Sequence, residues 1–397
     1  ARLSMVMAAL LLSTMEVHSS NEVRYGVDLG SYNPASPVTC TAITNATWSQ
    51  VNSAIVSALN NTTRGFVHIS GDVTGSGGTP GPLVITGSCA SVGFEIKGGF
   101  SADFASQNYN SKSVLNVAAS SGNQSRAIVI GASRVHLDGL GITGGYHSGG
   151  DAVALDFTDN GAGGAGIAAE CSGLHLSHLD IYGNNLVQGW KQGGGMYLRP
   201  TGTATSVLEY LVIHGNRVDG QAAGQVYGGG VFLDGDTLDA RLLFASSVIT
   251  GNTAVATAAS YKGLGSAVFV DGPRRSTAGT SYWVFFGLRV TDNNAGPSAS
   301  LGFNTCAKGL DTVGGKNAYA VMANCTFADN KGLGVTGTGG VWSWCRGNQY
   351  LNSVIADNGV GIYSDYCTMN LRSCLIDDVC PVGSSATNGF FGTWDPG

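Results

Sequence analysis

The chain has 397 residues, of which 12% are charged, 43% are hydrophobic and 61 are glycine. This composition excludes a disordered chain and a coiled coil, and the glycines follow no collagen period. A formal net charge of −6 gives no attraction for polyanions, so nucleic acids and anionic membranes are poor candidate partners.

The N-terminal segment, residues 1–20, contains one short apolar run at residues 4–12 (SMVMAALLL). The run has the length of a signal-peptide core and is too short to span a bilayer. Three interpretations stay open: a secretion signal, a retained hydrophobic cap, or a piece of a longer chain. The sequence predicts an extracellular or cell-surface location without a membrane span.

The next segment, residues 21–63, is predicted to form an N-terminal cap that contains a helix. Residues 47–50 (TWSQ) match a capping box, and Val51, Ile55 and Leu59 then fall on one helical face. Apolar strands follow from residue 64 onward. An amphipathic helix at this point would cover the open end of a stack of strands, whose edges are otherwise unpaired.

A short phrase recurs down the second half of the chain: an apolar residue, any residue, Gly or Asp, and then Asn. Residues 181–184 (IYGN) and 327–330 (FADN) are two copies. The asparagines are spaced by 32, 36, 41, 37 and 28 residues, which indicates loops of variable length on a fixed coil. The phrase ends at Asn184, Asn216, Asn252, Asn293, Asn330 and Asn358. We interpret these asparagines as a side-chain ladder at a turn, not as ligands.

A second phrase is a strand that begins with glycines, as in residues 193–198 (GGGMYL) and 228–233 (GGGVFL). Each coil therefore holds at least two short strands, which become stable only when the coils stack. The predicted fold is all-β: a right-handed parallel β-helix over residues 64–380, with an N-terminal amphipathic capping helix. Residues 381–397 are predicted to be a C-terminal tail.

The paired phrases resemble the repeat signature of polymorphic outer-membrane protein passengers. Residues 327–330 (FADN) and 228–231 (GGGV) carry the likeness, and residues 94–100 (FEIKGGF) are similar to a strand that often opens such helices. The resemblance implies a secreted or cell-surface structural or adhesive protein, including a subunit of an extracellular filament. It implies self-association, or binding to other surface proteins or glycans. The C-terminal residues lack the alternating strands of such a passenger's membrane barrel.

Parallel β-helices also include polysaccharide-degrading enzymes, so a lyase or hydrolase acting on an acidic glycan is the first alternative. The glycine-led strands place Asp234 and Asp271 at equivalent positions, and Arg274 lies close by. Two carboxylates could act as acid and base or bind calcium, and arginine could hold a sugar acid. Ordinary Asp-Gly turns explain the same residues, so the sequence favours a non-catalytic protein. A non-catalytic glycan-binding module is the second alternative.

The remaining motifs are weak. The seven histidines are scattered, with only His175 and His178 close together, so neither a metal site nor a cofactor is expected. Five glycosylation sequons occur. Asn45, Asn60, Asn61 and Asn123 are the candidate surface sites, whereas Asn324 adjoins Cys325 in an expected strand and is the poorer candidate.

The nine cysteines include five between Cys325 and Cys380, which favours disulfides in an oxidising compartment. Counting from the turn phrase places Cys345 in register with both Cys306 and Cys367. We favour the pair with Cys367, because the shorter coil leaves less freedom for a shift. Cys40 and Cys89 are the candidates for a second bridge, between the cap and an early coil.

Overall fold

The computed structural model divides the chain into two compact units, Ala1–Pro37 and Val38–Gly397. It describes residues 15–17, 23–25, 40–44, 46–59, 65–75, 81–86, 93–148, 163–187, 191–220, 226–234, 240–256, 263–271, 281–295, 310–313, 318–332, 341–343, 348–358, 362–364 and 369–376. In the first unit, β1 (Met15–Val17) pairs antiparallel with β2 (Val23–Tyr25).

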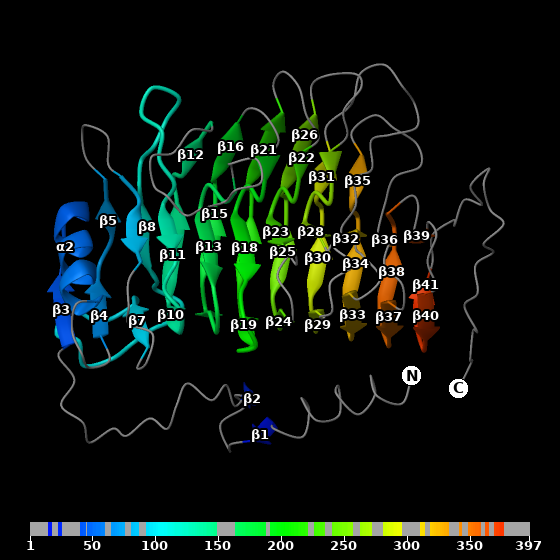
Figure 1. Cartoon of the computed structure of the whole chain (residues 1–397), viewed down its shortest axis with the longest axis horizontal. Helices are drawn as coiled ribbons and strands as arrows, with labels where there is room; N and C mark the ends of the chain where they lie inside the picture. Colours follow the sequence, from blue (N-terminus) through cyan, green and yellow to red (C-terminus); the bar gives the residue numbers. More distant parts are fainter. Residues whose placement is uncertain are drawn as a thin grey trace. The chain divides into compact units, whose positions relative to one another are not determined.

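The second unit is built from parallel sheets whose strands come from successive coils (Figure 1). Sheet I contains β3 (Cys40–Thr44), β4 (Gly65–Ser70), β7 (Phe94–Lys97), β10 (Val135–Asp138), β14 (His175–Ser177), β19 (Ser206–Glu209), β24 (Arg241–Ala245), β29 (Ser281–Phe286), β33 (Ala318–Ala323), β37 (Asn348–Leu351) and β40 (Met369–Arg372). Sheet II contains β5 (Val73–Thr74), β8 (Ser113–Asn116), β11 (Leu140–Thr143), β15 (Asp180–Tyr182), β20 (Val212–His214), β25 (Val248–Thr250), β30 (Arg289–Thr291), β34 (Thr326–Ala328), β38 (Val354–Ala356) and β41 (Leu375–Ile376).

Three further sheets complete the coils. Sheet III contains β6 (Leu83–Ile85), β9 (Ile128–Ile130), β13 (Ile167–Cys171), β18 (Met196–Pro200), β23 (Val231–Asp234), β28 (Val268–Asp271), β32 (Leu310–Val313), β36 (Val341–Ser343) and β39 (Ile362–Ser364). Sheet IV contains β12 (Tyr146–His147), β16 (Asn185–Val187), β21 (Arg217–Gly220), β26 (Thr253–Ala256), β31 (Asn294–Ala295) and β35 (Lys331–Gly332). Sheet V contains β17 (Lys191–Gln192), β22 (Val226–Tyr227) and β27 (Gly263–Leu264).

Pairing of each strand with its equivalent in the next coil confirms the predicted parallel β-helix. The resemblance to polymorphic outer-membrane protein passengers beyond that fold stays a prediction. Within the described residues, sheet I begins with β3, which precedes the helix in the chain and pairs in parallel with β4. The first strand of the stack thus comes from the segment that the sequence assigned to the cap.

The core consists of apolar columns that run through the coils. In sheet II, Ile181 pairs with Ile213 and Ile213 pairs with Ile249, and all three side chains are fully buried. Alternate residues of each strand point away from this core because side chains alternate across a strand. The outward positions are therefore the ones available for function.

The predicted capping helix is present as α2 (Trp48–Leu59). The backbone nitrogen of Thr47 donates to Oε1 of Gln50 at 2.8 Å, and that of Gln50 donates to Oγ1 of Thr47 at 3.3 Å. These two bonds form the capping box that satisfies the first turn. The buried face, which includes Val51 and Ile55, joins the same hydrophobic core as the strands. Among the described residues, no helix is long and apolar enough to cross a membrane.

The six asparagines of the repeated phrase form one hydrogen-bonded ladder. Nδ2 of each residue from Asn184 to Asn330 donates to Oδ1 of the next at 2.9 or 3.0 Å. All six side chains are buried. The residue before each asparagine has a positive φ, which glycine adopts freely and aspartate tolerates. This explains why Gly183 in one copy becomes Asp292 in another, with φ of 62° and 58°.

The ladder also explains the glycine-led strands. A Cβ atom at Gly195 would lie 2.7 Å from the carbonyl oxygen of Gly230 and 2.9 Å from Cγ of Asn216. Such distances are too short for a side chain at residue 195, so this strand passes the ladder as glycine. The two repeated phrases are thus one packing unit.

We expect Asn293→Ala to lower the free energy of unfolding by about 3 kcal/mol, because several buried partners lose their hydrogen bonds. Its amide donates to the carbonyl oxygens of Ile249 and Thr291 at 2.9 Å and accepts from Asn252. The neighbouring Asn294 makes only one long contact, 3.4 Å to the carbonyl oxygen of Asp292. Asn294→Ala should change stability by less than about 0.5 kcal/mol. Urea unfolding of both variants measures the difference, and equal effects would contradict the role of the ladder.

Candidate active site

Of the residues that the sequence offered for catalysis, the structure describes the side chain of Asp234, which is engaged by its own neighbours. Asp234 pairs in register with Asp271, and Nη2 of Arg199 donates to Oδ2 of Asp234 at 2.7 Å. The hydroxyl of Tyr197 donates to the same oxygen at 2.6 Å. Asp234, Arg199 and Tyr197 are all buried. The arrangement is a buried ion pair in sheet III, and Arg274 lies outside the described residues.

Other predicted site residues are only partly described. Among the sequon asparagines, Asn123 is half-buried, whereas Asn45, Asn60 and Asn61 lie outside the described residues. The disulfide candidates Cys89, Cys345 and Cys367 also lie outside them, and only the backbone of Cys40 is described, so both bridges stay predictions. Within the described part of the chain, no group of three or more His, Cys, Asp or Glu side chains could hold a metal ion.

The structure instead gathers titratable side chains on the outward face of sheet I, on four neighbouring strands. We call this set the acid–base face. One column consists of Glu95, His136 and His175, and the adjacent column consists of Lys97, Asp138, Ser177 and Glu209. The intervening residues Ile96, Leu137 and Leu176 point into the core and are fully buried. The alternation along each strand therefore places all the polar groups on one side.

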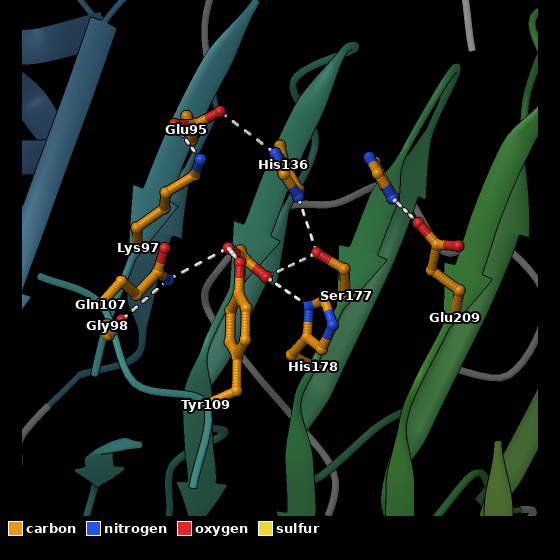
Figure 2. Close-up of polar contacts among 11 residues, drawn as sticks. Glu95, Lys97, Gly98, Gln107, Tyr109, His136, Ser177, His178 and Glu209 are labelled. Atoms are coloured by element: carbon orange, nitrogen blue, oxygen red, sulfur yellow. Dashed lines mark hydrogen bonds and ion pairs between the residues drawn. The ribbon is translucent and has the colours of Figure 1, made fainter. Parts of the chain in front are cut away.

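His178 follows Ser177 directly after β14 and completes the acid–base face. Each of its three histidines lies against its own carboxylate (Figure 2). The pairs are His136 Nδ1 with Glu95 Oε2 at 3.1 Å, His178 Nδ1 with Asp138 Oδ1 at 2.9 Å, and His175 Nε2 with Glu209 Oε1 at 2.8 Å. The carboxylates are more deeply buried than the rings, so the imidazoles form the accessible layer. A carboxylate beneath a histidine fixes its tautomer and orientation.

Asp138 is the centre of the face and accepts four hydrogen bonds. Ser177 Oγ and His178 Nδ1 lie 2.7 and 2.9 Å from Oδ1, and Gln107 Nε2 and Tyr109 OH lie 3.1 and 3.2 Å from Oδ2. Burial alone would raise the pKa of this carboxyl. The hydrogen bonds from His178 and Ser177, with the charge of His136, outweigh burial and hold the pKa well below its usual range. Asp138 is thus a fixed negative charge.

A long connection brings Tyr109 and Gln107 to this carboxylate. Residues 98–112 join β7 to β8 and fold back on themselves through a bridge between Phe100 and Gln107. The ring of Tyr109 then stacks on that of His178, with centroids 3.8 Å apart. On its other side, His178 stacks on Tyr210 at 5.0 Å. The imidazole is held between two phenol rings.

His178 and Tyr210 also have an unusual backbone. Their φ values are 50° and 54°, at a corner that Gly139 occupies one coil earlier and Ser246 one coil later. A left-handed conformation costs a bulky L-residue energy and is uncommon outside turns of Gly, Asn and Asp. Aromatic side chains at such positions suggest that their placement on the face serves a function.

The geometry leaves one nitrogen of His178 available for chemistry. Because Asp138 accepts from Nδ1, we assign the proton of the neutral ring to Nδ1 and the lone pair to Nε2. The described part of the chain offers no hydrogen-bond partner to Nε2, and the side chain is 22% exposed. Such a ring can accept a proton from a bound molecule and later return it.

Sequence reasoning noticed only the closeness of His175 and His178 and missed the rest of this face. A signal was nevertheless present. His136 and His175 each precede by six residues a core isoleucine of the next sheet II strand, Ile142 and Ile181, which pair with each other. Counting back from the repeated phrase would therefore have stacked the two histidines. No such count could have found Tyr109, which lies in the variable connection.

Comparisons with known proteins give two structural neighbours. No protein-family model matches the chain, and no curated protein matches it. The A-module of the mannuronan C-5 epimerase AlgE4 of Azotobacter vinelandii is 14% identical with a TM-score of 0.37, over 82% of this chain and 83% of that one. The A-module of AlgE6 from the same organism is 14% identical with a TM-score of 0.31, over 82% and 75%. Likenesses of this size carry no argument about what this chain does.

We expect Asp138→Asn to destabilise the protein at pH 7, because the amide cannot accept all four donors. The carboxylate has a depressed pKa in the folded state, so its ionisation stabilises the fold above the ordinary aspartate pKa of about 3.9. That contribution is lost as the pH falls from there through the lower native pKa. The difference in urea midpoint between wild type and variant should therefore shrink between pH 5 and pH 3.

Asp292→Asn is the matched control for this pH series. Asp292 is exposed and has a φ of 58°, which asparagine also tolerates. Its midpoint should follow wild type at every pH. A constant gap for Asp138→Asn across the series would show that the carboxylate's charge is not what stabilises this site.

Proposed function

We propose that the protein is an enzyme that removes a ring proton from a sugar unit of an acidic polysaccharide, as a lyase or an epimerase does. The observation that supports this is the His178 ring, clamped by Asp138 and two tyrosines with Nε2 directed away from its carboxylate. A histidine oriented in this way is a common general base.

Proton abstraction fits this face better than hydrolysis by two carboxyl groups. A glycoside hydrolase needs one carboxyl that stays protonated at working pH, and such groups have a raised pKa. The pKa of Asp138 is lowered instead, so it cannot supply that proton. Tyr109, whose hydroxyl reaches Asp138 and whose ring covers His178, is our candidate for donating a proton to the leaving oxygen.

A linear polymer matches the geometry of the face. Equivalent side chains of stacked strands repeat at about 4.8 Å along the stack. A sugar chain could therefore contact several coils in succession while one unit reaches His178. Lys97, 26% exposed and 3.2 Å from Glu95, is the lysine placed on this face to attract the sugar carboxylate. An extracellular location is part of the proposal, since such polymers lie outside cells.

A structural or adhesive role is the second candidate. The asparagine ladder favours it, because continuous side-chain bonds through six coils make a rigid unit whether or not the outer face is catalytic. The two roles differ in one respect that can be measured. Only the enzymatic role requires His178 with an Nε2 that can accept a proton from a bound molecule.

The test is incubation of the purified protein with a panel of acidic and neutral polysaccharides in D₂O. We expect an acidic glycan to gain either unsaturated ends or deuterium at the carbon next to its carboxylate. His178→Gln should reduce the rate by at least about 100-fold, because general-base catalysis contributes that much. Tyr109→Phe should reduce it as well.

His214→Gln is the matched control. His214 lies 3.0 Å from Asp180 in an equivalent histidine–carboxylate pair on sheet II, away from the acid–base face. This variant should keep the wild-type rate. Release of saturated reducing ends alone would overturn proton abstraction by His178. No change in any polysaccharide would overturn the enzyme proposal and leave the structural role.

A further inference from the structure

The acid–base face contains a continuous line of contacts that passes beneath His178. We propose that Ser177 is a positioning residue that passes a proton between the His178–Asp138 pair and the His136–Glu95 pair. The inference deepens the proposed function and rests on it for the role of His178. Its physical basis, however, is the arrangement of five side chains in the free protein.

The line consists of three contacts. Glu95 Oε2 lies 3.1 Å from Nδ1 of His136, Nε2 of His136 lies 2.8 Å from Oγ of Ser177, and Oγ of Ser177 lies 2.7 Å from Oδ1 of Asp138 (Figure 2). That same Oδ1 lies 2.9 Å from Nδ1 of His178. All these distances are within hydrogen-bonding range.

Counting hydrogens shows why Ser177 is the decisive residue. A neutral His136 has one ring hydrogen and Ser177 has one hydroxyl hydrogen, which makes two hydrogens for three contacts. A protonated His136 supplies the third: Nδ1 donates to Glu95, Nε2 donates to Ser177, and Ser177 donates to Asp138. The serine hydroxyl therefore points to His136 in one state and to Asp138 in the other.

The proton balance of the transfer is complete without another reactant. When His178 has taken a proton at Nε2, its Nδ1 hydrogen can move to Asp138 as the Ser177 hydrogen moves to Nε2 of His136. Asp138 passes its hydrogen to Ser177 in the same movement and remains a carboxylate. The net change is one proton moved from His178 to His136, which leaves His178 neutral with its remaining hydrogen on Nε2. Nε2 becomes basic again when it returns this hydrogen to the bound molecule and Nδ1 takes a hydrogen back through Asp138, Ser177 and His136.

The surroundings make His136 a site that can release this proton again. Burial lowers the pKa of the ring, while the hydrogen bond that Nδ1 donates to Glu95 opposes that effect. The ring also stacks on His175, with centroids 4.2 Å apart. The carboxylates of Glu95 and Asp138 attract a proton on His136, whereas a charge on His175 repels it. The other charged groups on the packed strands are Lys97 on β7, which pairs with Glu95, and Glu209 on β19, which pairs with His175.

The experiment is an NMR pH titration of the histidine rings in the free protein, so it does not depend on finding the substrate. If Ser177 couples the two histidine pairs, His136→Gln should shift the midpoint of the NMR titration of His178 by about 0.5 pH unit or more. In a Ser177→Ala background the same substitution should shift it by less than half as much. An equal shift in both backgrounds would show coupling through space and overturn the relay.

Two further variants keep the test decisive if Ser177→Ala fails to fold. Ser177→Thr keeps the hydroxyl and Ser177→Val has nearly the same shape without it, so both impose the same packing change. Coupling should persist with threonine and disappear with valine. Coupling retained with valine would overturn the proposal, as would a shift below about 0.2 pH unit in the wild-type background. If the wild-type protein acts on no polysaccharide but the titrations of His136 and His178 are coupled through Ser177, only the proposed function is overturned.

Discussion

Vertical register between neighbouring coils is the constraint on which the rest of this structure depends. A strand that slipped by one residue would turn its apolar side chains outward and its polar ones into the core. The buried asparagines oppose such a slip, since each amide must meet the amide above it. Glycines such as Gly195 let the backbone pass close beside that ladder. Register then sorts outward side chains into straight columns.

The acid–base face is a consequence of those columns. Burying a carboxylate is costly unless it is paired and hydrogen-bonded, and Asp138 meets both conditions through donors from two segments, the end of β14 and the connection of residues 98–112. A purely structural protein could fill the outward positions with apolar residues, as sheet I does with Leu243 and Val284 farther along the column of Glu95, His136 and His175. The concentration of histidines over carboxylates in one region therefore favours chemistry at this place.

The fold could be predicted from the sequence because each coil repeats the same short phrases. A glycine or aspartate before an asparagine specifies one corner, and the same corner recurs from Asn184 to Asn358. The site was harder to predict because it joins residues from different coils with one long connection. Tyr109 contacts Asp138 only because residues 98–112 fold back, and nothing in their composition reveals that path. The absence of known enzyme motifs favoured a structural interpretation, but motifs describe families and not geometry.

The asparagine ladder also makes the molecule modular. Each asparagine bonds to its immediate neighbours by the same atoms, so Asn216, Asn252 and Asn293 are interchangeable links. Loss or duplication of a whole coil would leave an identical joint on either side. The number of coils beyond β19 can therefore drift in evolution while the strands that carry the acid–base face remain unchanged. The length of the stack and the chemistry of the acid–base face can therefore change independently of each other.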